Sequence, residues 1–446
     1  MREKSKKQLP LMSPIIDHPQ ARELDCISKI LDEHSTIVDL VHQDLCKRHP
    51  IKTVGANGMS AEQVLRAAII KEMFGFSYEM LPFHLADSNS MQRFCRMGIA
   101  DKCFKKSAIA KNIKRISSDT WEQINRILVA HGNQKKVEKG RQVRIDCTVV
   151  ESNIHYPTDA TLLYDCVRVL ARILDRMRRW GIRLQYTDHS RRAKRRMLAV
   201  QYAKKEKQRI KSYQDLLKAT EKTAGYARRA IEQANQMPTV EAIGFRTDLQ
   251  KYIELTSNVI EQTRRRVLKG EKVPSGEKVV SIFEPHTDII VKDNRDTYYG
   301  HKVCLCVGAS NLISDCVITK GNPADTELTT IMLDRQNEIY GRYPLKVALD
   351  GGFASKANLE AAKGRHIKDV CFAKKRGLSV EKMCRSQWVY NRLRCFRAGV
   401  ESVISWIKRC FGFDRCTWKG QRSFESYVWL SAVTANLITL ARATPA

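Results

Sequence analysis

One stretch near the C-terminal end decides the fold: Arg392-Leu-Arg-Cys-Phe-Arg-Ala-Gly-Val-Glu401-Ser-Val-Ile-Ser-Trp-Ile-Lys408. At 3.6 residues per turn, this stretch predicts an amphipathic helix. The stripe expected to face a core consists of Val400, Val403, Ile404 and Ile407. Another side, at spacings of three, four or seven, carries Arg394, Arg397, Glu401, Ser405 and Lys408. That side is either a salt-bridged solvent face or an acid set among cations that hold phosphate.

Composition points to a polyanionic partner. The chain has 446 residues, enough for two or three domains, and a formal net charge of +30. Phosphate neutralisation by Lys and Arg dominates nucleic-acid binding, so an excess of this size favours nucleic acid. A membrane surface is the competing polyanion. The most apolar C-terminal run, residues 428–441, is interrupted by Ser, Thr and Asn and is shorter than the roughly 20 residues that span a bilayer.

The ends and the cysteines indicate a cytoplasmic protein. Residues 1–20 are expected to be a loose basic leader, because prolines and Asp17 follow the first lysines in place of an apolar signal core. The fourteen cysteines contain no C-x-x-C pair and no zinc-finger spacing. They are therefore expected to be buried thiols in a reducing compartment.

Residues 21–138 are predicted to form an all-α N-terminal domain that binds DNA. Apolar residues recur at helical spacing from residue 21 to about 49, and Ser60-Ala-Glu-Gln63 is a capping box. A helix from Ser107 should bury its isoleucines. Its outer face is either a base-reading surface or a plain solvated one, and carries Lys111, Asn112, Lys114 and Arg115.

The remaining residues, 139–446, are predicted to form a mixed α/β domain. The β-branched run 143–150 predicts a buried strand with Asp146 inside it, where a carboxylate is disfavoured unless it is paired or binds metal. Asp146 could also be a strand-end residue that caps a turn. Residues 345–349 predict a second buried strand that ends in Asp350-Gly-Gly-Phe, which is a usual place for a catalytic acid or simply a turn.

Between these strands lie a helical insertion and a meander. Residues 161–275 are helical and rich in arginine, which predicts a hairpin or coiled coil that touches DNA phosphates, or a merely solvated face. Short strands are expected after the insertion, at residues 279–283, 288–291, 301–307 and 312–318.

Three acids thus stand on two strands and one helix: Asp146, Asp350 and Glu401. If they converge at a sheet edge, they can hold two Mg²⁺ ions roughly 4 Å apart, one activating a water or 3′-hydroxyl and the other stabilising the departing oxygen. Mn²⁺ could replace Mg²⁺ in such a site. The arrangement is typical of phosphodiester cleavage and transfer by in-line attack.

Five motifs resemble those of bacterial insertion-sequence transposases of the DDE class. The stretch Asp146-Cys-Thr-Val-Val-Glu-Ser-Asn153-Ile-His155-Tyr-Pro-Thr-Asp159 is similar to the first-acid motif, and Asp350-Gly-Gly-Phe to the second. Tyr299-Gly-His-Lys302 resembles the Y-G-x-K element. Arg397-x3-Glu401-x6-Lys408 matches the Y-x2-R-x3-E-x6-K signature except at the tyrosine, where Arg394 stands; Tyr390 is a candidate to take its role. Residues 55–116 resemble the family's helical N-terminal domain.

The resemblance implies an RNase H-like catalytic domain and a transposase that binds the terminal inverted repeats of its element. Its triad would be Asp146, Asp350 and Glu401, with Arg397 and Lys408 on DNA phosphate, while Asn153, His155 and Lys302 are candidates to line the site. The partners would be double-stranded end and target DNA, and a second copy of the chain in a dimer or larger synaptic complex. Two alternatives stay open: a metal-dependent nuclease of the same fold, and a catalytically idle DNA-binding protein derived from a transposase.

Overall fold

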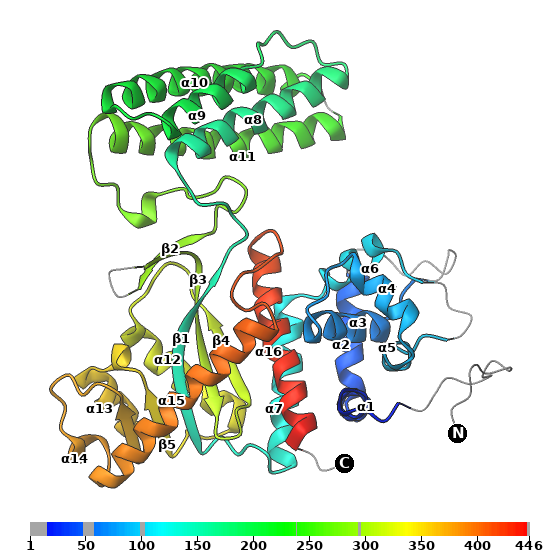
Figure 1. Cartoon of the computed structure of the whole chain (residues 1–446), viewed down its shortest axis with the longest axis vertical. Coiled ribbons are helices and arrows are strands. Elements are labelled where there is room, and N and C mark those ends of the chain that lie inside the picture. The colour runs from blue at the N-terminus through cyan, green and yellow to red at the C-terminus, as the bar shows by residue number, and fades with distance from the viewer. Residues whose placement is uncertain (1–15, 48–57, 99–102, 238, 293–295, 444–446) are drawn as a thin grey trace, which may run out of the picture. The chain divides into compact units, whose positions relative to one another are not determined.

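The computed structural model describes residues 16–47, 58–98, 103–237, 239–292 and 296–443 (Figure 1). Most of the predicted basic leader, residues 1–15, lies outside this part of the chain. The chain forms two compact units, one of residues 152–301 and the other of residues 1–151 with 302–446. The domain limits expected at residues 20 and 138 stay a prediction.

The unit of residues 152–301 is built on four helices that lie side by side in Figure 1. Their bounds are α8 Asp159–Arg179, α9 Ser190–Gln201, α10 Glu206–Asn235 and α11 Val240–Thr263, with a π-helical turn at Arg264–Leu268 and a 3₁₀ turn at Ser275–Glu277. They enclose a single core that includes Leu163, Leu170, Leu217 and Val259. The predicted hairpin or coiled coil is therefore wrong: non-helical breaks at residues 180–189, 202–205 and 236–237 divide the insertion into a bundle.

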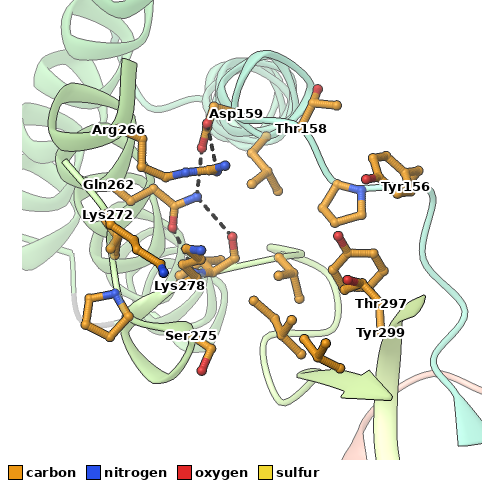
Figure 2. Close-up of a pocket in the computed structure, with 18 residues that line it drawn as sticks. Tyr156, Thr158, Asp159, Gln262, Arg266, Lys272, Ser275, Lys278, Thr297 and Tyr299 are labelled. Atoms are coloured by element: carbon orange, nitrogen blue, oxygen red, sulfur yellow. Dashed lines mark hydrogen bonds and ion pairs between the residues drawn. The ribbon is translucent and has the colours of Figure 1, made fainter. Parts of the chain in front are cut away.

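Residues 279–283 form a loop, so the strand predicted there is also wrong. The side chain of Gln262 takes the place of a neighbouring strand, since it accepts from the Val279 N–H (2.9 Å) and donates to the Val279 carbonyl (3.2 Å). Figure 2 shows this contact at the wall of a cavity of about 620 Å³, which Lys272 and Lys278 also line. Ile282 is buried in the core of the bundle. Burial and the hydrogen bonds to the Gln262 side chain thus stabilise residues 279–283 as a loop, although their apolar sequence resembles that of a strand.

The strands predicted after this loop are confirmed. β2 (Asp288–Lys292) pairs antiparallel with the first half of β3 (Asp296–Gly308), and β3 then pairs antiparallel with β4 (Ile313–Ile318). Within β3, Cys304 and Cys306 share one buried face, as alternation predicts. All fourteen cysteines are reduced, but the expectation of burial is wrong for Cys103, Cys395 and Cys410, which are exposed.

Within the residues that the structure describes, the other unit begins with seven helices. Their bounds are α1 Pro19–Asp32, α2 Ser35–Cys46, α3 Ala61–Met73, α4 Met80–Asp87, α5 Asn89–Phe94, α6 Lys106–Ile113 and α7 Ser118–Gln134. The capping box of Ser60 and Gln63 is confirmed. The helical pattern from residue 21 is two helices, because His34 leaves the helical conformation (φ −128°, ψ 69°) between α1 and α2.

A mixed sheet forms the centre of this unit. β1 (Gln142–Glu151) lies between β3 and β5 (Lys346–Leu349), and β5 pairs with β6 (Asp369–Phe372). The β1–β5 and β5–β6 pairs are parallel. The connecting elements are α12 Asp325–Tyr340, a 3₁₀ turn Gly351–Phe353, α13 Lys356–Gly364, α14 Val380–Met383, α15 Gln387–Cys410 and α16 Gln421–Ala443. The predicted mixed α/β architecture is confirmed.

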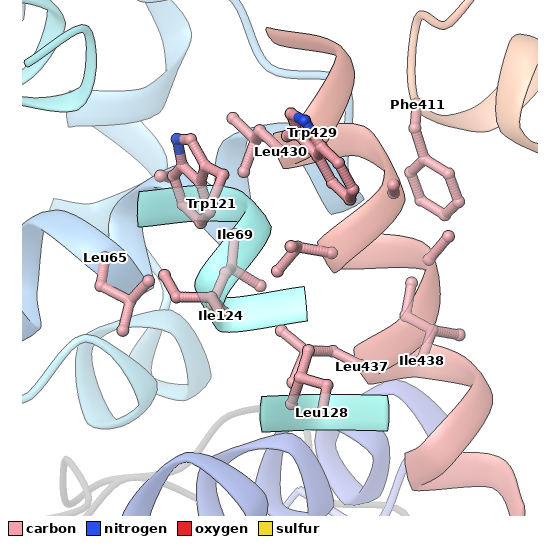
Figure 3. Packing of buried hydrophobic residues seen from close by; sticks show 14 of the residues in the cluster. Leu65, Ile69, Trp121, Ile124, Leu128, Phe411, Trp429, Leu430, Leu437 and Ile438 are labelled. Carbon is pink, nitrogen blue, oxygen red and sulfur yellow. The ribbon is translucent and has the colours of Figure 1, made fainter. Parts of the chain in front are cut away.

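The last helix, α16, joins the N-terminal helices to the sheet in one core. Figure 3 shows Trp121, Ile124 and Leu128 of α7 beside Leu430 and Leu437 of α16. A second core on the sheet includes Ile145, Val347 and Leu393, and thereby anchors α15. Within the described residues, no helix is both long and apolar enough to cross a membrane.

A buried amide network ties α7, α16 and β4 together. Asn436 donates to the Asn125 side-chain oxygen (2.7 Å) and to the Ile313 carbonyl (2.8 Å), and accepts from the Ile313 N–H (2.8 Å). Both asparagines are at most 1% exposed. A buried polar group that loses its partner costs about 1–3 kcal/mol, so the network should contribute measurably to stability.

Replacement of Asn436 by alanine is expected to lower the free energy of unfolding by roughly 1–3 kcal/mol, because the Ile313 N–H and the Asn125 oxygen lose their partner. Urea unfolding followed by circular dichroism measures the change. Asn391→Ala, which removes an exposed Asn391–Gln387 hydrogen bond on α15, is the control and should have little effect. Equal stability of Asn436→Ala and wild type would contradict this role.

Candidate active site

The docking of α15 on β1 sets the geometry of the acids. The Arg144 guanidinium, on β1, donates to the Phe396 carbonyl (3.0 Å) and lies over the Phe396 ring, 4.8 Å from its centroid. It also donates to the side-chain oxygen of Asn311. A side chain at Gly399 would overlap this guanidinium, so only glycine lets α15 come this close to the strand. The helix is thereby held with one face toward Asp146.

The structure brings the three predicted acids to one guanidinium. Arg397 Nη2 lies 2.8 Å from Asp350 Oδ1 and 3.2 Å from Asp146 Oδ2, and Arg397 Nη1 donates to Glu401 Oε1 at 2.7 Å. The parallel register pairs Ile145 with Leu349, which places the two aspartates at adjacent positions just beyond. Glu401 follows Arg397 by one helical turn.

Burial differs across this cluster. The side chains of Asp146 and Arg397 are 14% and 16% exposed, while those of Asp350 and Glu401 are 36% and 62% exposed. Arg397 Nε is buried and has no hydrogen-bond acceptor among the described residues. The cluster is therefore buried on the side of β1 and exposed on the side of Glu401. Its central cation, Arg397, keeps one N–H group that has no acceptor among the described residues.

The acids are spread more widely than the ligands of one ion. In the described part of the chain, ligand atoms of three His, Cys, Asp or Glu side chains come within 4.8 Å of one another at Glu33, His34 and His131, not at the triad. The oxygens of Asp146, Asp350 and Glu401 instead contact the two terminal nitrogens of one guanidinium. All of them are carboxylate oxygens, the donor type that Mg²⁺ prefers.

Lys302, expected to line the site, supports the loop after Asp350. Its ammonium lies 2.9 Å from Asp325 Oδ1 and donates to the Pro323 carbonyl at 2.6 Å. Asp325 in turn packs against Gly352, where a β-carbon would collide with its carboxylate. Asp325 was not among the site residues predicted from the sequence; a lysine inside a largely buried strand was the signal that a carboxylate partner was needed.

The other residues of the signature have different surroundings. Lys408 Nζ lies 3.3 Å from Asp414, and Arg394 is exposed on α15. Tyr390 does not replace the missing tyrosine, because it is 2% exposed and its hydroxyl donates to the Phe372 carbonyl at 3.0 Å. That tyrosine anchors α15 to β6 within the core.

The predicted base-reading face is only partly helical. α6 ends at Ile113 and starts after Lys105, not at Ser107, so Lys111 and Asn112 lie on the helix while Lys114 and Arg115 follow it. The Lys114 ammonium lies over the rings of Tyr78 (5.3 Å) and Trp418 (5.7 Å), and burial lowers its pKa. Lys111 is exposed.

Asn153 and His155, proposed to line the site, belong to the unit of residues 152–301. Both are exposed in the loop between β1 and α8, and His155 Nε2 lies 3.5 Å from Asp165 Oδ2. Their part in the chemistry stays a prediction.

Two models of known protein families match parts of the chain. A family model described as a transposase DDE domain matches residues 281–437, and one described as a transposase domain (DUF772) matches residues 18–115. The chain is therefore a member of the insertion-sequence DDE transposase family, whose members are nucleotidyl-transfer enzymes that act on DNA and generally use divalent metal ions. The DDE match contains Asp350 and Glu401 and begins after Asp146. No curated protein and no solved structure matches the chain.

Gly399→Ala is expected to destabilise the protein by about 1–3 kcal/mol, although alanine normally stabilises a helix by roughly 0.5–1 kcal/mol over glycine. The added methyl group displaces Arg144 from the Phe396 carbonyl. Thermal unfolding measures the change. The matched control is Gly225→Ala in α10, where the methyl group meets nothing within 4 Å and should be neutral or stabilising. If Gly399→Ala changed the stability in the same direction as Gly225→Ala, α15 would have room for a side chain at Gly399.

Proposed function

We propose that this transposase binds the terminal inverted repeats of its insertion sequence and catalyses Mg²⁺-dependent strand cleavage and strand transfer through Asp146, Asp350 and Glu401. The observation that carries the proposal is the convergence of these acids, from two adjacent parallel strands and one helix, on Arg397. Acids on neighbouring strands and a covering helix are the arrangement that the RNase H-like assignment requires.

Two Mg²⁺ ions, or Mn²⁺ in their place, are the cofactors we assign to the three acids. The donor set fits, since it consists of carboxylate oxygens on an open side of the sheet. When bound, the ions supply charge stabilisation at the attacking and departing oxygens. In their absence Arg397 supplies the positive charge that keeps the carboxylates together.

In this proposal Arg397 contacts the three acids first and a DNA phosphate afterwards. Once cations neutralise the acids, its guanidinium is available to a DNA phosphate, which it can bind through two parallel N–H groups. Lys408 and Arg394 on the same helix would hold neighbouring phosphates as further cations.

DNA binding is proposed for two surfaces. The first is the α6 region, with Lys111, Asn112, Lys114 and Arg115, as a base-reading or phosphate-holding element of the N-terminal helices. The second is the cationic side of the bundle, whose exposed cations include Arg172, Arg176, Arg191, Lys194 and Arg195. Binding through these residues should weaken steeply as salt rises.

Because two element ends must be joined to one target, we further propose that the active species is a homodimer or a larger synaptic complex. A nuclease of the same fold and a catalytically idle DNA-binding protein are the alternatives. Joining of ends distinguishes the transposase from the nuclease, and cleavage distinguishes both from the idle protein.

Glu401→Gln and Asp350→Ala are each expected to reduce cleavage of the element ends by at least about 100-fold, since each removes a carboxylate from the charge-stabilising site. End binding should be unchanged. The substrate is labelled duplex DNA from the two flanks of the coding region, incubated with Mg²⁺ and analysed for cut and joined strands.

The control for Glu401→Gln is Glu360→Gln, which changes an exposed glutamate on α13. It should cleave like wild type. Full cleavage by the Glu401 and Asp350 variants would refute the triad, and wild-type cleavage without joining would identify a nuclease.

Arg397→Gln tests whether the guanidinium and the metal ions compete. Without Arg397 the three carboxylates repel one another, so the variant should melt at lower temperature than wild type in a chelating buffer. Added Mg²⁺ should then raise its melting temperature by more than it raises that of wild type, because no cation has to be displaced.

Arg394→Gln, three residues earlier on the same helix, should respond to Mg²⁺ like wild type. An equal Mg²⁺-induced shift in Arg397→Gln and wild type would show that the ions do not bind where Arg397 lies.

A further inference from the structure

The cavity that Figure 2 shows has no part in the proposed transposition chemistry. Its volume of about 620 Å³ is within the range of roughly 300–1,000 Å³ that is usual for sites that bind small molecules. All of its lining residues belong to the unit of residues 152–301. The walls are formed by the start of α8 with the residues before it, the end of α11 with the π-helical turn, the segment 272–280, and the paired strands β2 and β3.

Positive charge is in excess at one wall of this cavity. The lining residues include one acid, Asp159, which is 6% exposed. Its carboxylate lies 2.9 Å from Arg266 Nη1 and accepts from the Gln262 amide at 3.2 Å, so it already balances one cation. The other two cations of the wall, Lys272 and Lys278, form no ion pair among the described residues.

The neighbouring acids of the same segment do not supply the missing negative charge. Glu271 and Glu277 lie 3.0 Å and 2.7 Å from the Arg265 guanidinium, and neither lines the cavity. Burial, and after it the charge of Arg266, lower the pKa of the Lys278 ammonium. The cations of the wall therefore repel one another, and an anion in the cavity would relieve this repulsion.

The opposite wall is aromatic. Figure 2 shows Tyr156 and Tyr299 across the cavity from Arg266, Lys272 and Lys278. The two tyrosine rings are perpendicular, and their centroids are 5.7 Å apart. Tyr156 is 74% exposed, so most of its ring is accessible. Aromatic side chains of this kind bind nucleic-acid bases by stacking, whatever the base.

We propose that this cavity binds a nucleoside monophosphate group, with the phosphate on Lys272 and Lys278 and the base against Tyr156 and Tyr299. An inorganic anion would use the cations alone, and an uncharged ring would use the tyrosines alone. A nucleotide joins a phosphate to a planar base and therefore matches both walls.

Such a group has two sources: a free mononucleotide, or an unpaired 5′-phosphorylated nucleotide at the end of a DNA strand. The phosphate monoester and the base are the same in both. No residue of the cavity belongs to the triad, so the inference does not rest on the proposed strand transfer. Nucleotide binding can persist if cleavage by the triad fails, and the reverse.

The test measures binding to the full-length chain by isothermal titration calorimetry, with 5′-dAMP, inorganic phosphate and deoxyadenosine as probes. We expect one equivalent of 5′-dAMP to bind, and each of the other two probes to bind at least about 10-fold more weakly, because each contacts one wall only. Lys278→Gln and Tyr156→Ala should each weaken 5′-dAMP binding by about 10-fold.

Two variants in the same unit are the matched controls. Lys218→Gln removes the charge of an exposed lysine on α10, and Tyr202→Ala removes a tyrosine that is 79% exposed. Both should bind 5′-dAMP like wild type. Should Lys278→Gln fail to fold by circular dichroism, acylation of wild type decides, since 5′-dAMP should protect Lys272 and Lys278 but not Lys218 from an amine-reactive reagent.

Two DNA duplexes identify the source of the nucleotide. One is blunt, and the other has one unpaired 5′-phosphorylated nucleotide at each end. A strand end is identified if the second duplex binds more tightly and both Lys278→Gln and Tyr156→Ala abolish the difference. A free nucleotide is identified if the chain binds 5′-dAMP and binds the two duplexes equally. The proposal fails if 5′-dAMP does not bind, if phosphate binds as tightly, or if the Lys278 and Tyr156 variants bind 5′-dAMP like wild type.

Discussion

Three carboxylates cannot share a small space without a cation, and Arg397 is that cation in this chain. Its two terminal nitrogens contact Asp146, Asp350 and Glu401 within 3.2 Å. Mutual repulsion of the acids would otherwise open the edge where β1, β5 and α15 meet. The position of α15 follows from this requirement, and Arg144 and Gly399 meet it by bringing the helix backbone against the strand.

Much of this arrangement could be predicted from the sequence, because its signals are local and physically strong. The stripe of Val400, Val403 and Ile407 is buried and orients α15. The β-branched runs around Asp146 and before Asp350 form strands, as expected. Three acids on three elements suggested one site, and the contacts to Arg397 show that they do meet.

The sequence could not show which groups contact one another in the folded chain. Residues 279–283 have strand composition, yet their backbone bonds to the side chain of Gln262, a contact over 17 positions that no periodicity reveals. The sequence predicted a hairpin or coiled coil where the structure has a four-helix bundle, since apolar spacing gives helix faces but not how many helices share them. Lys302 was expected at the acids, but a strand lysine pairs with whichever carboxylate the fold presents, here Asp325.

The parallel pairing of β1 with β5 also has a consequence for biosynthesis. Ile145 pairs with Leu349, so about 200 residues must be translated before the strand that carries Asp146 gains this neighbour. At roughly 5–20 residues per second, that edge stays open on the ribosome for about 10–40 seconds. A nascent chain in this interval has an unpaired strand edge, a known risk for aggregation.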